Sequence, residues 1–128
     1  MLLSLTRSGT SGHWVVAAAG GGVAGAVVWR GETVPTGAGE VDAELEVPGE
    51  VDWRTIVAAS TRANVPSPAE DELLLRGVVE DLDQDGVLTL RVAGSVVLID
   101  TVGEPPLHVV GQEVAMVVHS AELYPTGV

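Results

Sequence analysis

The sequence predicts an all-β domain: a single small barrel or barrel-like sandwich of about seven strands, with one or two short helical turns. Valine recurs along the whole chain, and its β-branched side chain favours an extended backbone. Glycine- and proline-rich stretches divide the apolar segments into short runs that alternate with polar residues, as half-buried strands do. The 128 residues suit one domain with a substantial core, so we expect a single domain over residues 1–128.

The composition narrows the range of functions. The chain has a net charge of −12 and no cysteine, and all of its basic residues are arginine. The lack of cysteine excludes disulfides, thiol nucleophiles and thiolate metal sites. The negative charge disfavours nucleic acid and anionic membranes and favours a basic protein partner. Arginine without lysine is typical of a GC-rich genome, and we expect a bacterial, cytoplasmic protein without a cofactor.

The first long apolar segment, residues 14–29, reads WVVAAAGGGVAGAVVW and carries no charged side chain. It is shorter than the roughly 20 residues of a membrane-spanning helix, and its glycines weaken any helix. Because it reads nearly the same backwards, it predicts a hairpin that turns at Gly21 and Gly22 and places Trp14 opposite Trp29. Both faces of this hairpin are apolar, so we expect part of it to be buried between subunits of a homo-oligomer.

Glycines in the same segment also match the G-x-G-x-x-G pattern of dinucleotide-binding loops, at Gly20, Gly22 and Gly25. That motif requires a long helix after it, whereas Arg30 and Pro35 follow closely here. The hairpin turn accounts for the glycines better than a nucleotide site does.

Residues 39–47 alternate apolar and acidic side chains without a break, and so predict a strand. With the hairpin, this strand makes up the N-terminal part of the predicted domain, residues 14–47. Its acidic side chains are the candidate partner-binding residues: Glu40, Asp42, Glu44 and Glu46. Neighbouring carboxylates on one strand lie about 6.6–6.8 Å apart, too far to share a metal ion. The simpler interpretation is a solvated outer face, and the more specific one is a docking surface for a cationic protein.

The middle of the chain contains the predicted helical turns. Asp52 is a candidate N-cap, and residues 53–60 suit either a short helix or a strand. Residues 61–69 have the composition of a loop, within which Ser67 to Glu70 form a capping box that predicts one or two helical turns.

The C-terminal region divides into a three-stranded meander and a late strand. The divisions fall at residues 83–86 and 93–95, and the late strand follows Gly111. With Gly77 in a long first strand, this order over residues 73–124 resembles an oligonucleotide/oligosaccharide-binding (OB) barrel. The resemblance implies a small closed barrel. OB domains that bind nucleic acid use basic and aromatic side chains, but this region offers only Arg76, Arg91 and Tyr124, so we expect no nucleic-acid partner.

One turn in this region matches the start of a calcium loop. Asp81, Asp83, Asp85 and Gly86 reproduce D-x-D-x-D-G, in which alternate carboxylates bind one ion. Position 12 of such a loop is Val92 instead of glutamate, and the flanking segments are predicted strands. An acidic hairpin turn is therefore the favoured interpretation, with weak cation binding as the alternative.

No catalytic constellation is visible. His13, His108 and His119 are far apart in sequence, and Ser120 points away from its neighbour His119 if both lie on a strand. We therefore predict a non-enzymatic interaction or accessory protein that binds a basic protein partner, in the manner of an immunity protein or inhibitor. The alternative is a small-ligand-binding or enzymatic β-barrel whose site is assembled across strands.

Overall fold

A computed structural model of the chain describes residues 1–7, 13–32, 35, 39–59 and 65–126. Within these residues the fold is all-β, as predicted, but it contains eleven strands instead of about seven. The strands are β1 (Leu2–Arg7), β2 (His13–Ala18), β3 (Val23–Trp29), β4 (Gly39–Glu46), β5 (Glu50–Asp52), β6 (Val57–Ala58), β7 (Glu72–Leu82), β8 (Val87–Val92), β9 (Ser95–Val102), β10 (Glu113–His119) and β11 (Glu122–Pro125). The additional strands include β5 and β6, which are too short to show an alternating pattern.

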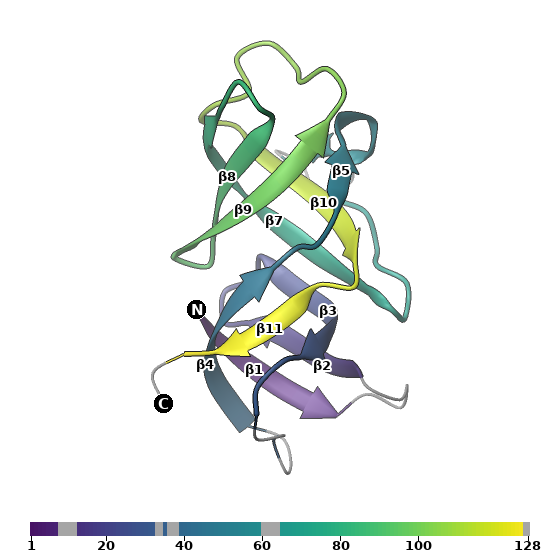
Figure 1. Cartoon of the computed structure of the whole chain (residues 1–128), viewed down its shortest axis with the longest axis vertical. Helices are drawn as coiled ribbons and strands as arrows, with labels where there is room; N and C mark the ends of the chain where they lie inside the picture. The colour runs from purple at the N-terminus through teal and green to yellow at the C-terminus, as the bar shows by residue number, and fades with distance from the viewer. Residues whose placement is uncertain (8–12, 33–34, 36–38, 60–64, 127–128) are drawn as a thin grey trace.

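Five strands close into a first ring, which forms the lower part of Figure 1. The strands pair in the order β11-β4-β1-β2-β3, and β3 pairs back to β11 in parallel. The other neighbours in this ring are antiparallel. Alternate side chains of these strands are buried, including Leu3 on β1, Trp14 on β2 and Leu45 on β4. The period-2 pattern of the sequence therefore supplies the core of this ring.

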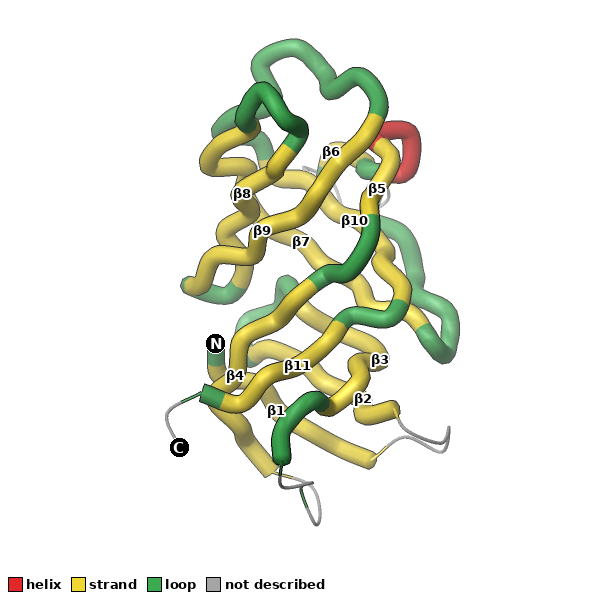
Figure 2. The backbone as a smooth tube through the Cα atoms, viewed as in Figure 1, coloured by secondary structure: helices red, strands yellow, loops and turns green. Residues whose placement is uncertain are grey.

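The other six strands form a second ring, in the upper part of Figure 1. The strands β7, β8 and β9 form an antiparallel meander, and β9 pairs in parallel with β5. On the other side, β10 pairs with β7 and with β6. The 3-10 helix η1 (Trp53–Thr55) lies between β5 and β6 (Figure 2), so these two short strands act as one interrupted strand that closes the ring.

The two rings are built from two halves of the chain with the same strand order. The halves are β1 to β6 and β7 to β11. In each half the first three strands form a meander and the first strand pairs with the fourth. The fifth strand then crosses over: β5 pairs with β9 of the second half, and β11 pairs with β3 of the first half. Each half thus supplies the strand that closes the other half's ring.

The small closed barrel that the resemblance implied is present as the five-stranded first ring, which is compatible with an OB-like fold. The second ring contains most of residues 73–124 and is completed by β5 and β6, which pair with β9 and β10 but not with each other. Its boundaries differ from the predicted 73–124, because β5 and β6 belong to it and β11 belongs to the first ring. The segment that completes the second ring therefore precedes the meander in sequence. Membership of the OB family stays a prediction.

The predicted hairpin over residues 14–29 is confirmed as β2 and β3, but its register was wrong. Trp14 lies opposite Val27, and Val15 lies opposite Ala26. The turn is longer than two residues, because Gly20, Gly21 and Gly22 all adopt positive φ before β3 begins at Val23. On β2 burial alternates, and the outward Val15 is 40% exposed, whereas Ala26 and Val27, at consecutive positions of β3, are both buried. The homo-oligomer stays a prediction.

A short pairing between β3 and β7 joins the rings on one side. Gly25 of β3 lies opposite Leu73, and a Cβ at Gly25 would lie 2.3 Å from the Glu72 carbonyl oxygen. The glycine that resembled part of a nucleotide motif is thus required by the close approach of two backbones. No helix follows it in the described part of the chain until η1.

The segment from Asp52 to the start of β7 tests the remaining local predictions. Asp52 caps η1 by accepting a hydrogen bond from the Arg54 N–H at 2.9 Å, and β6 follows, so residues 53–58 contain both a helical turn and a strand. The Trp53 Nε1–H donates to the buried Thr101 Oγ1 at 3.0 Å. The helical turn predicted at Ser67 to Glu70 was wrong. The Glu72 carboxylate accepts from the Ala69 N–H at 2.7 Å, which forms a tight turn directly before β7.

Within the described residues, η1 is the only helix, and no helix has the length and apolar character needed to cross a membrane.

Candidate functional site

The predicted acidic strand is β4, and its alternation is confirmed. Ala43 and Leu45 are buried, whereas the carboxylate-bearing residues point outward and are exposed. We call the outward side chains of β4 the acidic face; they are Glu40, Asp42, Glu44 and Glu46. The strand is held by β1 along its first half and by β11 along its second half, which fixes the direction of these side chains.

One member of the acidic face is neutralised within the chain. The amino group of Met1 lies 2.9 Å from the Asp42 Oδ1. This hydrogen bond and the adjacent positive charge lower the pKa of Asp42 from its usual value. The side-chain carboxylates of Glu40, Glu44 and Glu46 form no hydrogen bond or ion pair with any residue that the structure describes. The sequence did not show this difference, because Met1 and Asp42 are brought together only by the β1–β4 pairing.

The neighbouring strand β11 extends the acidic character and adds an aromatic ring. Glu122 lies directly opposite Glu46, and Tyr124 lies opposite Glu44. Two like charges in a cross-strand pair repel each other. Arg30, which follows β3, forms an ion pair with Glu122 and offsets that repulsion. Tyr124 was not predicted to lie beside the acidic face, because β11 belongs to the other half of the chain. The contribution of Arg30 was not predicted either, because it depends on the pairing of β3 with β11, which brings Arg30 to Glu122.

An open groove runs between the two rings, next to the acidic face. It has a volume of about 810 Å³. One wall is the end of β4, with Glu44 and Glu46, and the other is the β8–β9 hairpin, with Val96 and Leu98. The two apolar side chains on β9 are 46% and 61% exposed, respectively. The groove therefore combines an anionic wall with an apolar one, and we call it the inter-ring groove.

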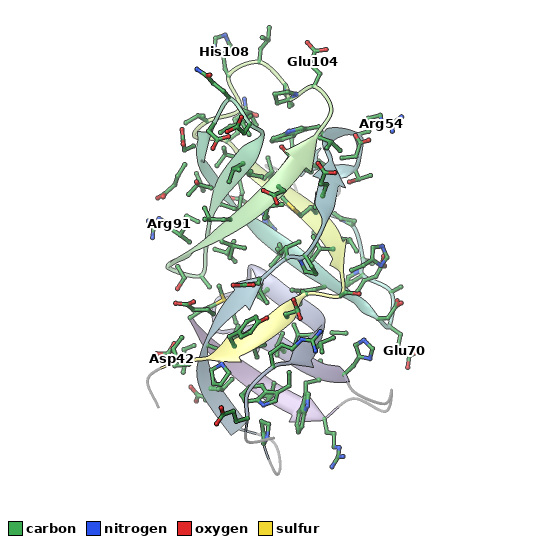
Figure 3. All side chains as sticks on the ribbon, viewed as in Figure 1. Asp42, Arg54, Glu70, Arg91, Glu104 and His108 are labelled. Carbon is green, nitrogen blue, oxygen red and sulfur yellow. The ribbon has the colours of Figure 1, made fainter. Side chains whose placement is uncertain are left out.

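Arginine enters the groove lining at one point. Arg91 lines the groove and forms an ion pair with Glu80, which lowers the pKa of Glu80 through the hydrogen bond and the positive charge. Figure 3 shows Arg91 and Asp42 on the same side of the molecule, above and below the space between the rings. Because Arg91 is already paired, the two glutamates on the β4 wall leave the groove with a negative charge.

The acidic turn at 81–86 is a hairpin turn, as favoured. The Asp83 carboxylate accepts from the N–H groups of Asp85 and Val87, each at 2.9 Å, and Gly86 has a φ of +87°. These bonds direct Asp83 into its own turn, as in an Asx-turn. Neither Asp81 nor Asp85 joins it in a cluster: among the described residues, no group of three or more acidic or histidine side chains could hold a metal ion.

The three histidines lie on separate elements of the fold, and Ser120 lies outside the strand that carries its neighbour His119. His119 lies at the end of β10, where its Nε2 is 3.1 Å from the Glu72 Oε2, and it is mostly exposed. His13 begins β2, and His108 lies with Glu104 at the opposite tip of the molecule (Figure 3). Ser120 has a positive φ of 56° between β10 and β11, so it is not a strand residue as expected. This arrangement supports no catalytic assignment for any of them.

Comparison of the chain with protein-family models, curated protein sequences and solved structures finds no significant match.

Proposed function

We propose that this chain is a non-enzymatic interaction protein that binds a basic protein partner through its acidic face, in the manner of an inhibitor or immunity protein. The observation that carries the proposal is the set of three exposed carboxylates on β4 that have no partner among the described residues: Glu40, Glu44 and Glu46. They lie on a paired strand, which presents them in a fixed row.

The energetics favour recognition of a cation over a purely structural role. Exposed like charges in a row destabilise the compact state unless salt or an opposite charge screens them. A basic partner would relieve that repulsion and would also be attracted over long range by the net charge of −12. Such binding is expected to weaken as the ionic strength rises.

A second function is favoured by the inter-ring groove alone. Its volume of about 810 Å³ falls within the range of small-molecule sites, about 300–1,000 Å³. A small ligand would fill the groove without needing Glu40, which does not line it. Binding that is insensitive to Glu40 and to salt would therefore favour this alternative.

The test is the affinity for a defined cation, an acetylated hexa-arginine amide, measured by isothermal titration calorimetry. In the variant E40Q/E44Q/E46Q we expect about tenfold weaker binding, because each exposed ion pair contributes about 0.2–1 kcal/mol. The matched control, D81N/D100N/E104Q, removes the same charge from exposed residues elsewhere and should change the affinity by no more than about twofold. Equal losses in both triple variants would show that net charge alone attracts the peptide, and the proposal would fail.

A further inference from the structure

The internal duplication reveals a strand position that is filled in one half and open in the other. In the second half, Leu73–Leu75 at the start of β7 pair on one edge with β10 and on the other with β3. They therefore form a strand segment between two others and join the two rings. Leu73 and Leu75 are fully buried there.

The equivalent position in the first half lies between β4 and β9. There β1 begins at Leu2. The last hydrogen bond between β1 and β4 on this side is the one that the Ala43 N–H donates to the Met1 carbonyl oxygen, with an N–O distance of 2.8 Å. No described strand pairs with β9 over Ser95–Ile99 on the edge away from β8. The inter-ring groove occupies this place, since its walls include Leu45 and Val96.

Both walls of the groove present backbone hydrogen-bonding groups. The β8–β9 turn has positive φ at Ala93 and Gly94, the geometry of a two-residue type I′ turn, so Val92 and Ser95 form a hydrogen-bonded pair. Because the bonding direction alternates along a strand, the N–H and C=O groups of Val96 and Leu98 point away from β8.

The same alternation applies to β4. The Ala43 N–H bonds to Met1 on the β1 side, and the Asp42 carbonyl oxygen accepts from the Thr126 N–H on the β11 side. The N–H and C=O of Leu45 therefore face the β1 side, which is the side of the groove. The groove is thus bordered by an open strand edge on each wall.

We propose that the inter-ring groove accepts an extended segment of the partner protein as an added β-strand, and that basic residues alternate with apolar ones in this segment. This inference rests on the proposed function and specifies its binding mode. Exposed strand edges commonly bind peptides in this way, with the backbone supplying affinity and alternate side chains supplying specificity.

The side chains around the groove determine the sequence of the segment. Outward side chains of an added strand would lie between Glu44 and Glu46 on one wall and Val96 and Leu98 on the other. An arginine or lysine fits this position, because its aliphatic stem can cover the apolar side chains while its charge meets the carboxylates. Inward side chains would take the place that buried Leu73 and Leu75 hold in the second half, so they should be apolar.

Two synthetic peptides of identical composition and charge test the inference on the full chain. One alternates, acetyl-Val-Arg-Val-Arg-Val-Arg-amide, and the other is blocked, acetyl-Val-Val-Val-Arg-Arg-Arg-amide. We expect the alternating peptide to bind about tenfold more tightly, a gain that a few strand hydrogen bonds supply. Hydrogen–deuterium exchange should show protection of the Leu45, Val96 and Leu98 amides with the alternating peptide only.

Two variants separate the binding mode from the charge attraction. V96P removes one groove-facing N–H, and it should reduce the affinity for the alternating peptide to that for the blocked one; circular dichroism checks that it folds. E44Q/E46Q should weaken binding of both peptides. If both peptides bind equally and the three amides stay unprotected, strand addition is wrong and the acidic docking surface stands. If neither peptide shows salt-sensitive binding, both proposals are wrong.

Discussion

The exchange of closing strands predicts where a mutation in β11 will act. Leu123 is fully buried and follows β10 closely in sequence, yet its cross-strand neighbours are Trp29 and Leu45 of the first ring. Replacing Leu123 by alanine should therefore loosen the first ring and leave the meander of the second ring nearly unchanged.

The magnitude follows from burial. A buried leucine replaced by alanine costs about 2–5 kcal/mol, against a total unfolding free energy of about 5–15 kcal/mol for a domain. For a chain of 128 residues this corresponds to a fall in Tm of roughly 8–20 °C, at about 4 °C per kcal/mol. Urea denaturation measures the free energy of unfolding, and hydrogen–deuterium exchange resolved by residue locates the change.

The equivalent residue in the other half provides the matched variant. Val51 of β5 corresponds to Leu123 of β11, and it lies opposite Thr101 of the second ring. V51A should cost about 1.6 kcal/mol, two methyl groups at about 0.8 kcal/mol each, and should increase amide exchange in β9. L123A should increase it in β3 and β4. If L123A instead increases exchange in β7 to β10 and leaves β3 and β4 protected, the exchanged arrangement is wrong.

Three further predictions concern the fold. T101V leaves the buried Trp53 Nε1–H without its acceptor and removes the bond that the Thr101 hydroxyl donates to the Gly86 carbonyl oxygen, so it should lower the unfolding free energy by about 1–3 kcal/mol in urea titrations. An unchanged midpoint would show that the two bonds together add nothing. G77A places a Cβ 2.2 Å from the Arg91 carbonyl oxygen and should cost about 1–3 kcal/mol, while the control G39A, with open space around it, should be nearly neutral. The lowered pKa of Asp42 stabilises the folded state above the unfolded pKa, so D42N should have a lower Tm than the unmodified chain at pH 6, and the two should converge as the pH falls below about 4. A constant Tm difference down to pH 2.5 would contradict the pairing of Asp42 with Met1.

Local patterns in the sequence predicted the strands that alternate over six or more residues. The acidic strand β4 and the meander β7 to β9 follow the period-2 burial that their side chains indicate. The hairpin at 14–29 was predicted because the segment reads nearly the same backwards, but the register was wrong because the turn uses three consecutive glycines with positive φ instead of two.

The long-range arrangement could not be predicted in the same way. The two halves share strand order but little sequence, so the duplication is visible only in pairings such as Glu50 with β9 and Glu122 with β3. For the candidate site, the carboxylates of β4 were identified from the sequence. The apolar wall at Val96 and Leu98 was missed, because these residues read as ordinary strand positions and their exposure results from the open edge of β9.

The exchanged strands also impose an order on folding. The strands β1 to β4 are synthesised before β11, so the first ring stays open, with unpaired edges on β3 and β4, while the whole second half leaves the ribosome. Local hairpins can form early, but closure of this ring requires contacts between segments far apart in the chain, which form slowly. During that interval the open edges are able to pair with another chain. The arrangement that ties the two halves together in the native state is therefore also the step at which newly made chains are most exposed to misassembly.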